Sequence, residues 1–154
     1  MKAFYFVLII TLFVSCSSVP NETKKYNKYF SGVREEKETV VITYDISDSL
    51  AHDFIKIWIS RQFQDGIREI IVDDIINGII AGSSKVTTVI FRTEYTEFIT
   101  YTIFIKNGSA NLNIDTIMVT GFFLSENQEA ADTMARDIFK KFNYRIKDSF
   151  QKIF

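Results

Sequence analysis

The sequence has little from which most reactive centres could be built. Its 154 residues include one cysteine, one histidine and one proline. One cysteine excludes an internal disulfide bond, and one cysteine with one histidine cannot supply the three or four such ligands of a common zinc site. The net charge of −1 at pH 7 argues against nucleic acid as a partner. We therefore predict no catalytic residue, no metal site and no cofactor.

The main charge-free apolar run lies at the N-terminus. Residues 3–14 carry no charged side chain and follow Lys2. A membrane-spanning helix needs about 20 apolar residues, whereas an export signal has a shorter apolar centre behind a basic residue. Residues 1–15 are therefore predicted to be a signal peptide that takes no part in the fold. An uncleaved anchor is an alternative.

The end of this run, Phe13-Val14-Ser15-Cys16, resembles the lipobox of bacterial lipoproteins. The resemblance implies that the Cys16 thiol receives a diacylglyceryl group, that the signal is cut before it, and that a fatty acid such as palmitate acylates the new amino terminus. Ser17 replaces the aspartate of many inner-membrane lipoproteins, so the resemblance favours the outer membrane, with the domain facing the periplasm or cell surface. A plain secretory signal is the other alternative.

Residues 16–37 are predicted to form a lipidated, flexible tether, because they are polar and contain Pro20 and Gly32. Lysines mixed with aromatic residues at 24–30 are typical of segments that settle at the headgroup level of a bilayer. Alternatively, Tyr29 and Phe30 pack on the domain and the lysines are solvated.

Residues 38–150 are predicted to form a single α+β domain. The β-branched segment 39–44 predicts a strand, and Ser47 to Ser49 offer caps for a helix over residues 48–64 that ends before Gly66. Apolar residues recur along this helix at three- and four-residue spacing, which predicts one buried face. The expected stripe consists of Leu50, Phe54, Ile57, Trp58 and Arg61, widened by Ala51, Ile55, Ile59 and Phe63.

Turn signals divide the following segment into four strands. Asn77-Gly78 separates apolar runs at 67–72 and 79–91, and Asn107-Gly108 separates runs at 97–106 and 110–123. Asn-Gly between apolar runs is the strongest local hairpin signal. A second helix is expected after the capping-box sequence 125–128, with an apolar stripe of Ala131, Met134, Ala135, Ile138, Phe142 and Ile146. The order strand, helix, four strands, helix predicts two helices on one face of a curved antiparallel sheet.

This order resembles the TATA-binding-protein-like fold. More narrowly, several motifs resemble those of a family of bacterial lipoprotein domains of unknown function. The resemblance covers nearly the whole mature domain, implies a fold and an anchor, and implies no activity. DNA binding is not expected, since that use needs a basic sheet. The matching residues are Trp58 in the first helix, Asp73-Asp74 leading to Gly78-Ile79-Ile80, and the hairpin Lys106-Asn107-Gly108.

His52 would have to be the base of any Ser-His-Asp triad. No serine lies in a Gly-x-Ser-x-Gly motif, and Cys16 cannot act as a nucleophile once its sulfur is alkylated. We therefore expect His52 to be an exposed residue of the helix surface, beside Asp48 and Asp53.

Two acidic clusters are candidate calcium ligands. Asp73 and Asp74 lie near Asn77, and Glu94 lies near Glu97. Neither cluster has the alternate acidic spacing of a calcium loop, so solvated turns are the preferred interpretation.

Aromatic residues at strand spacing are expected in the core, although Phe98 and Phe104 alternate with Ile99 and Ile103 and so give apolar residues to both sheet faces. A second apolar face needs a partner. We predict a lipid-anchored bacterial envelope protein that acts as a non-enzymatic interaction or binding module for another envelope protein. The alternatives are a carrier or sensor of a small apolar or glycan ligand between helices and sheet, and an envelope hydrolase. The aromatic set is Trp58, Phe91, Phe98, Tyr101, Phe104, Phe122 and Phe123.

Overall fold

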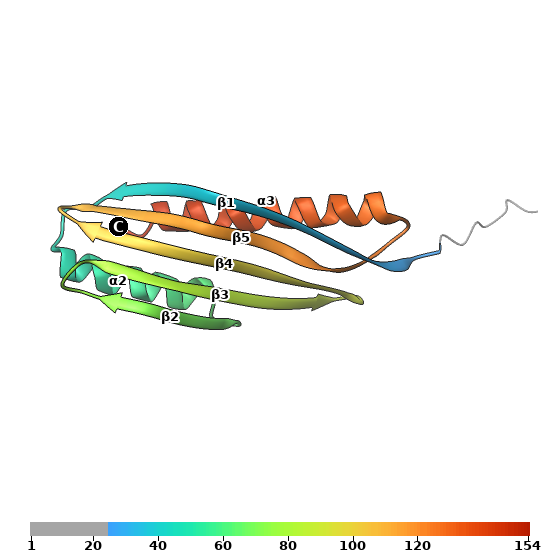
Figure 1. The fold of residues 1–154 in the computed structure, drawn as a ribbon, viewed down its shortest axis with the longest axis horizontal. Coiled ribbons are helices and arrows are strands. Elements are labelled where there is room, and N and C mark those ends of the chain that lie inside the picture. Colours follow the sequence, from blue (N-terminus) through green and yellow to red (C-terminus); the bar gives the residue numbers. More distant parts are fainter. Residues whose placement is uncertain (1–24) are drawn as a thin grey trace, which may run out of the picture.

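A computed structural model describes residues 25–154 as one antiparallel sheet with two helices (Figure 1). The strand order in the sheet is β1-β5-β4-β3-β2. The predicted α+β class and the chain order of the elements are confirmed. The signal-peptide and Cys16 predictions lie outside the described residues. The elements are β1 (Asn27–Thr43), α2 (Asp48–Gln62), β2 (Ile67–Asp74), β3 (Ile79–Ile90), β4 (Thr93–Lys106), β5 (Ser109–Ser125) and α3 (Gln128–Gln151).

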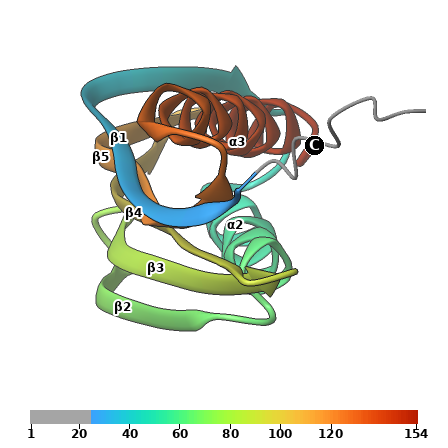
Figure 2. The ribbon, with the colours of Figure 1, turned by 90° about the vertical axis from the view of Figure 1, so that its right-hand side faces the viewer.

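The sheet curves around both helices, which lie on its concave side (Figure 2). The helix α3 packs along β1 and β5, while α2 lies nearer to β4. Between these layers lies a core built mainly of isoleucine and phenylalanine. No helix within residues 25–154 combines the length and apolar composition needed to span a membrane. The largest fully buried side chains include Phe63, Phe123, Phe142, Phe150, Ile55 and Ile103.

The strand β1 begins at Asn27 rather than near residue 39, so the prediction of a flexible tether over residues 16–37 is wrong for residues 27–37. This part of β1 pairs with β5, with Phe30 opposite Phe122. Tyr29 and Val33 face inward and pack against the core. An edge strand with one face toward water tolerates the polar residues that made this segment resemble a linker.

The predicted stripe of α2 is confirmed in part: Trp58 and the four residues expected to widen the stripe are buried, whereas its other members lie at the surface. Leu50, Phe54 and Ile57 are 41–46% exposed. Buried residues lie one position after each of these, at Ala51, Ile55 and Trp58. Because α2 is apolar around much of its circumference, spacing alone did not distinguish the two sides. The buried residues of α2 are Ala51, His52, Ile55, Trp58 and Ile59.

Caps and turns set the element boundaries. Ser47 Oγ accepts a hydrogen bond from Leu50 N, and Asn127 Oδ1 accepts one from Ala130 N, so Asn127 rather than Ser125 caps α3. Both expected Asn-Gly turns are present. The β3–β4 turn, which no glycine marks, consists of Phe91 and Arg92 only. On α3, the expected burial of Ala131, Ala135, Phe142 and Ile146 is confirmed, whereas Met134 is 36% exposed.

Candidate functional site

The prediction of an exposed His52 is wrong, because its side chain is only 2% exposed. It belongs to the buried stripe of α2, and Nε2 lies 3.2 Å from Oδ1 of Asp73 at the end of β2. The second oxygen of Asp73 accepts a 2.6 Å hydrogen bond from Nζ of Lys56. Spacing relative to Ile55 and Ile59 was the signal that could have placed His52 inside. Through its hydrogen bond with Lys56, the Asp73 carboxylate therefore joins the first turns of α2 to the edge strand β2.

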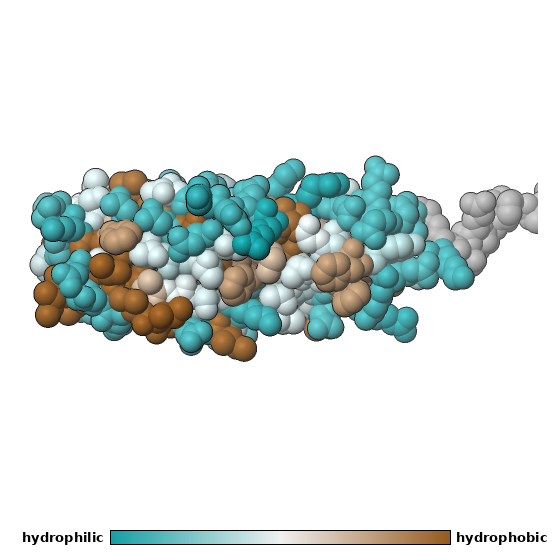
Figure 3. All heavy atoms as spheres, in the orientation of Figure 1, coloured by the Kyte–Doolittle hydropathy of each residue, from teal (hydrophilic) through white to brown (hydrophobic). Residues whose placement is uncertain are grey.

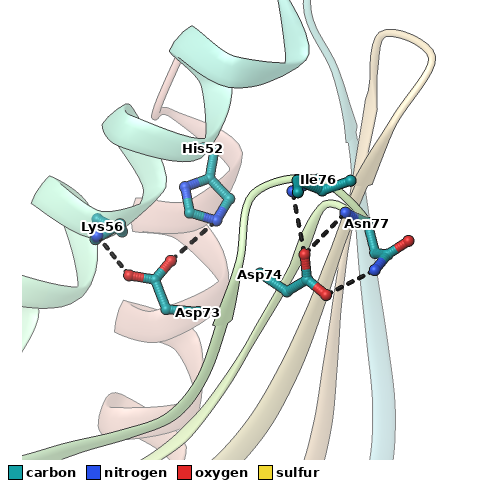
Figure 4. Close-up of polar contacts among 6 residues, drawn as sticks. All are labelled: His52, Lys56, Asp73, Asp74, Ile76 and Asn77. Carbon is teal, nitrogen blue, oxygen red and sulfur yellow. Dashed lines mark hydrogen bonds and ion pairs between the residues drawn. The ribbon is translucent and has the colours of Figure 1, made fainter.

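Asp74 is occupied by its own turn. One carboxylate oxygen accepts hydrogen bonds from the backbone N–H groups of Ile76 and Asn77, and the other accepts a 2.7 Å hydrogen bond from the Asn77 side-chain amide (Figure 4). These contacts, the Asn77 amide foremost, hold the pKa of Asp74 below its usual value. Asp73 and Asp74 have separate partners, so this pair is explained by turn and helix contacts.

Glu94 and Glu97 lie on opposite faces of β4. Glu94 pairs with Phe122 on the helix-free face. Glu97 points toward the helices and accepts a 2.6 Å hydrogen bond from the guanidinium of Arg145. Two carboxylates on opposite sheet faces cannot share one ion. Within residues 25–154, no group of three or more His, Cys, Asp or Glu side chains is arranged to hold a metal ion.

The helix-free face of the sheet is polar in its middle and apolar toward its ends. Its central positions carry mainly threonine and asparagine, as the cross-strand pairs Thr100–Thr116 and Thr102–Asn113 show. Of the predicted core aromatics, Trp58, Tyr101 and Phe123 are buried, whereas Phe104 and Phe122 are 41% and 48% exposed on this face. The expected apolar contribution to both faces is therefore present, but it is concentrated at the two ends.

One apolar surface lies around the β2–β3 turn and is brown at the left of Figure 3. We call it the isoleucine end. Ile76 is 92% exposed and Ile71, which sits at a β-bulge, is 69% exposed. The strand β2 is also the outermost strand of the sheet, so one of its backbone edges has no neighbour in the described part of the chain. The isoleucine end comprises Ile71, Val72, Ile75, Ile76 and Phe104.

A second apolar surface lies at the other end of the molecule, where β1 begins and β3 turns into β4 (Figure 1). We call it the aromatic end. Beside it an apolar cleft of about 520 Å³ opens between the end of the sheet and α3, with Tyr26, Leu124 and Ile138 in its walls. This surface was not predicted from the sequence, because the core was the preferred interpretation for Phe91 and the lining of a ligand cleft only the alternative. The aromatic end comprises Phe30, Val89, Ile90, Phe91 and Phe122.

No family model matches the chain, and no curated protein is significantly similar to it. Two solved structures are similar in outline. A DUF4468 family protein from Bacteroides ovatus is 15% identical, with a TM-score of 0.40, over 72% of this chain and 67% of its own. The Zhui aromatase/cyclase from a Streptomyces species is 9% identical, with a TM-score of 0.33, over 79% of this chain and 91% of its own. TM-scores this low indicate neither a shared fold nor a shared function.

Proposed function

We propose that this protein is a lipid-anchored component of a bacterial envelope that binds another envelope protein and catalyses no reaction. The isoleucine end is the observation that carries this proposal. It combines five exposed apolar side chains with the free backbone edge of β2. Such an edge can accept a strand from a partner, with the side chains of that edge providing specificity.

The anchor rests on Cys16 and the segment before it. If Cys16 is lipidated, the variant Cys16→Ala remains unprocessed or lacks acyl chains, and it migrates differently from the wild type on gels. Unchanged membrane attachment and mobility of Cys16→Ala would exclude the lipoprotein assignment. A matched control is Ser18→Ala, which leaves the cysteine and the three residues before it intact.

The partner surface is tested by photo-crosslinking in cells. A photoreactive residue at Ile76 should give a discrete crosslinked product, because that side chain is 92% exposed at the centre of the isoleucine end. The same residue at Tyr144, which is 69% exposed on α3, should not. A second change, Ile71→Asp, should remove the Ile76 product, since a carboxylate does not enter an apolar contact.

A charge reversal far from the isoleucine end, Arg34→Asp on β1, is the control for this second change. It should leave the Ile76 product intact. Equal crosslinking at Ile76 and Tyr144, or a product that survives Ile71→Asp, would refute the isoleucine end as a binding surface.

A second function, transport or sensing of a small apolar ligand, is favoured by the cleft at the aromatic end. Its volume of about 520 Å³ falls within the usual range for small-molecule sites, and its walls are mainly apolar. Native mass spectrometry of freshly isolated protein would reveal a bound ligand. The variant Ile138→Lys should abolish that additional mass, because it places a charge in the cleft wall.

The fold label is also part of the proposal. The order β-α-β-β-β-β-α and the single curved sheet support a TATA-binding-protein-like fold. DNA binding does not follow from that label, because the chain has no basic excess.

A further inference from the structure

The β3–β4 hairpin has an unfavourable turn. Three hairpins lie within residues 25–154, and two of them place glycine in the left-handed conformation, at Gly78 and Gly108. The third places Phe91 and Arg92 there, with φ of 47° and 68°. Left-handed turn positions favour glycine and asparagine, whereas a bulky side chain is strained. The same chain therefore uses the favourable chemistry in two turns and departs from it in the third.

Phe91 is also 92% exposed, so its ring gains little from the protein interior. Backbone strain and an exposed aromatic ring both act against the stability of the isolated domain. An observed outlier of this kind is evidence for a function of the turn itself.

The residues around Phe91 extend the same surface across the sheet. In one row, Val89 on β3 pairs with Glu94 on β4, and Glu94 pairs with Phe122 on β5. Phe122 in turn pairs with Phe30 on β1, and their rings meet edge to face with centroids 5.4 Å apart. Aromatic residues accompanied by lysine or arginine concentrate at membrane–water interfaces. Lys28 and Arg92 lie at this end of the sheet.

The segment between Cys16 and the described residues is short, so a membrane anchor at Cys16 would lie close to this end of the domain. From Cys16 to Lys25 an extended chain spans at most about 30 Å. Tyr26 lines the cleft beside Phe91, so the chain enters the domain at the aromatic end. The isoleucine end is roughly 40 Å away, the length of β3 at about 3.3 Å per residue. An anchor at Cys16 can thus hold the aromatic end against a bilayer.

We infer that the aromatic end inserts into the headgroup region of the anchoring bilayer, so that the isoleucine end points away from the membrane. This inference rests on the proposed anchor at Cys16. Three acidic residues at this end, Glu94, Glu126 and Glu129, balance three basic ones, Lys25, Lys28 and Arg92. The contact is therefore apolar, and its strength should change little with salt concentration.

Lipid contact can be measured on the full acylated protein in vesicles of phosphatidylethanolamine and phosphatidylglycerol. Acylation blocks Cys16, the only native cysteine, so an introduced cysteine is the single thiol available to a polarity-sensitive fluorophore. The variants Phe91→Cys and Ile76→Cys form a matched pair, because both positions are 92% exposed and they lie at opposite ends. The probe at residue 91 should emit at shorter wavelength and be quenched by spin-labelled lipid, whereas the probe at residue 76 should not.

The outcomes separate the two proposals. Labelling of the wild-type chain at Cys16 would show a free thiol and overturn the anchor together with this inference. A wild-type chain that takes no label, combined with equal quenching at residues 91 and 76, would overturn the inference alone. Salt that abolishes the quenching at residue 91 would also contradict an apolar contact.

A second variant separates membrane contact from folding. Phe91→Asn with Arg92→Gly supplies favoured left-handed turn residues, so it should raise the thermal unfolding midpoint. With the probe moved to Val89→Cys, which is on the same hairpin and 68% exposed in the native chain, quenching by lipid should fall. Unchanged quenching in this more stable variant would show that Phe91 does not contact lipid.

Discussion

The indole N–H of Trp58 donates a 3.0 Å hydrogen bond to Oγ of Ser149, and this bond joins α2 to α3. The hydroxyl of Ser149 is in turn bonded to the carbonyl of Ile146. The Trp58 ring also meets Phe150 edge to face, with centroids 5.2 Å apart. Since the two helices cover different strands, this contact couples the two halves of the core.

Removing the hydroxyl should therefore weaken the domain. Ser149→Ala removes the partner of the Trp58 indole N–H at a partly buried site, so the free energy of unfolding should fall by about 1 kcal/mol. Urea unfolding measures this loss. Ser60→Ala, at an exposed position of α2, is the control and should lie within about 0.5 kcal/mol of the wild type. Equal effects of the two variants would show that the bond contributes nothing.

The two turn glycines should differ in their tolerance of alanine. Both have positive φ, of 65° at Gly78 and 75° at Gly108, which costs a residue with a Cβ roughly 1–2 kcal/mol. A Cβ on Gly78 would also clash with the backbone carbonyl of Ile105, whereas the nearest atom to a Cβ on Gly108 is the Tyr44 carbonyl oxygen at 3.2 Å. Gly78→Ala should therefore lower the thermal unfolding midpoint clearly more than Gly108→Ala. A larger loss at Gly108 would contradict this turn geometry.

The ion pair between Arg145 and Glu97 gives a third prediction. The Glu97 side chain is 10% exposed, and its carboxylate lies 2.6 Å from the guanidinium of Arg145. Arg145→Ala leaves a nearly buried charge unpaired, so it should destabilise the domain by about 2–3 kcal/mol. Adding Glu97→Gln removes that charge and should recover part of the loss. Chemical unfolding of the two single variants and the double variant would reveal this coupling, and simple additivity would argue against it.

Asp48 should make the domain sensitive to acid. Hydrogen bonds from the Tyr44 hydroxyl and from the backbone N–H groups of Asn107 and Gly108 hold the pKa of Asp48 below its usual value of 3.8. Because the pKa is lower in the folded state, this contribution to stability is present above pH 3.8 and is lost as the pH falls through the folded-state pKa. Asp48→Asn should therefore flatten the decline in stability below about pH 4. Asp53→Asn, an exposed change on the same helix, should retain the wild-type pH profile.

Much of the fold was predictable because its signals are local. Asn107-Gly108 predicts a hairpin because these two residues favour the left-handed turn conformation. A single apolar stripe that includes Ala135 and Phe142 predicts the helix α3. The extent of β1 was not predictable in this way. Residues 27–37 are mostly polar, and the apolar residues among them are too few to predict a strand without the pairing with β5.

The candidate surfaces were harder to predict for a related reason. Phe91 is of a residue type usually found in the core, but a two-residue turn places its side chain at the surface. His52 is of a residue type often found at the surface, but the orientation of α2 buries its side chain against Asp73. The type of a residue gives its side chain a preference for burial, but the packing of neighbouring helices and strands determines whether that side chain is buried.

The sequence by itself determined the α+β class, the succession of elements and the Asn-Gly turns, since each depends on the backbone preferences of residues close together in the chain. The tertiary structure alone decided which side of α2 is buried, that β2 is an edge strand, and that exposed apolar residues gather at opposite ends of the sheet. These features arise from strand order and register, which bring together residues as distant in sequence as Phe30 and Phe122. No local pattern contains that information, because pairing across the sheet depends on the sum of many contacts between separate segments.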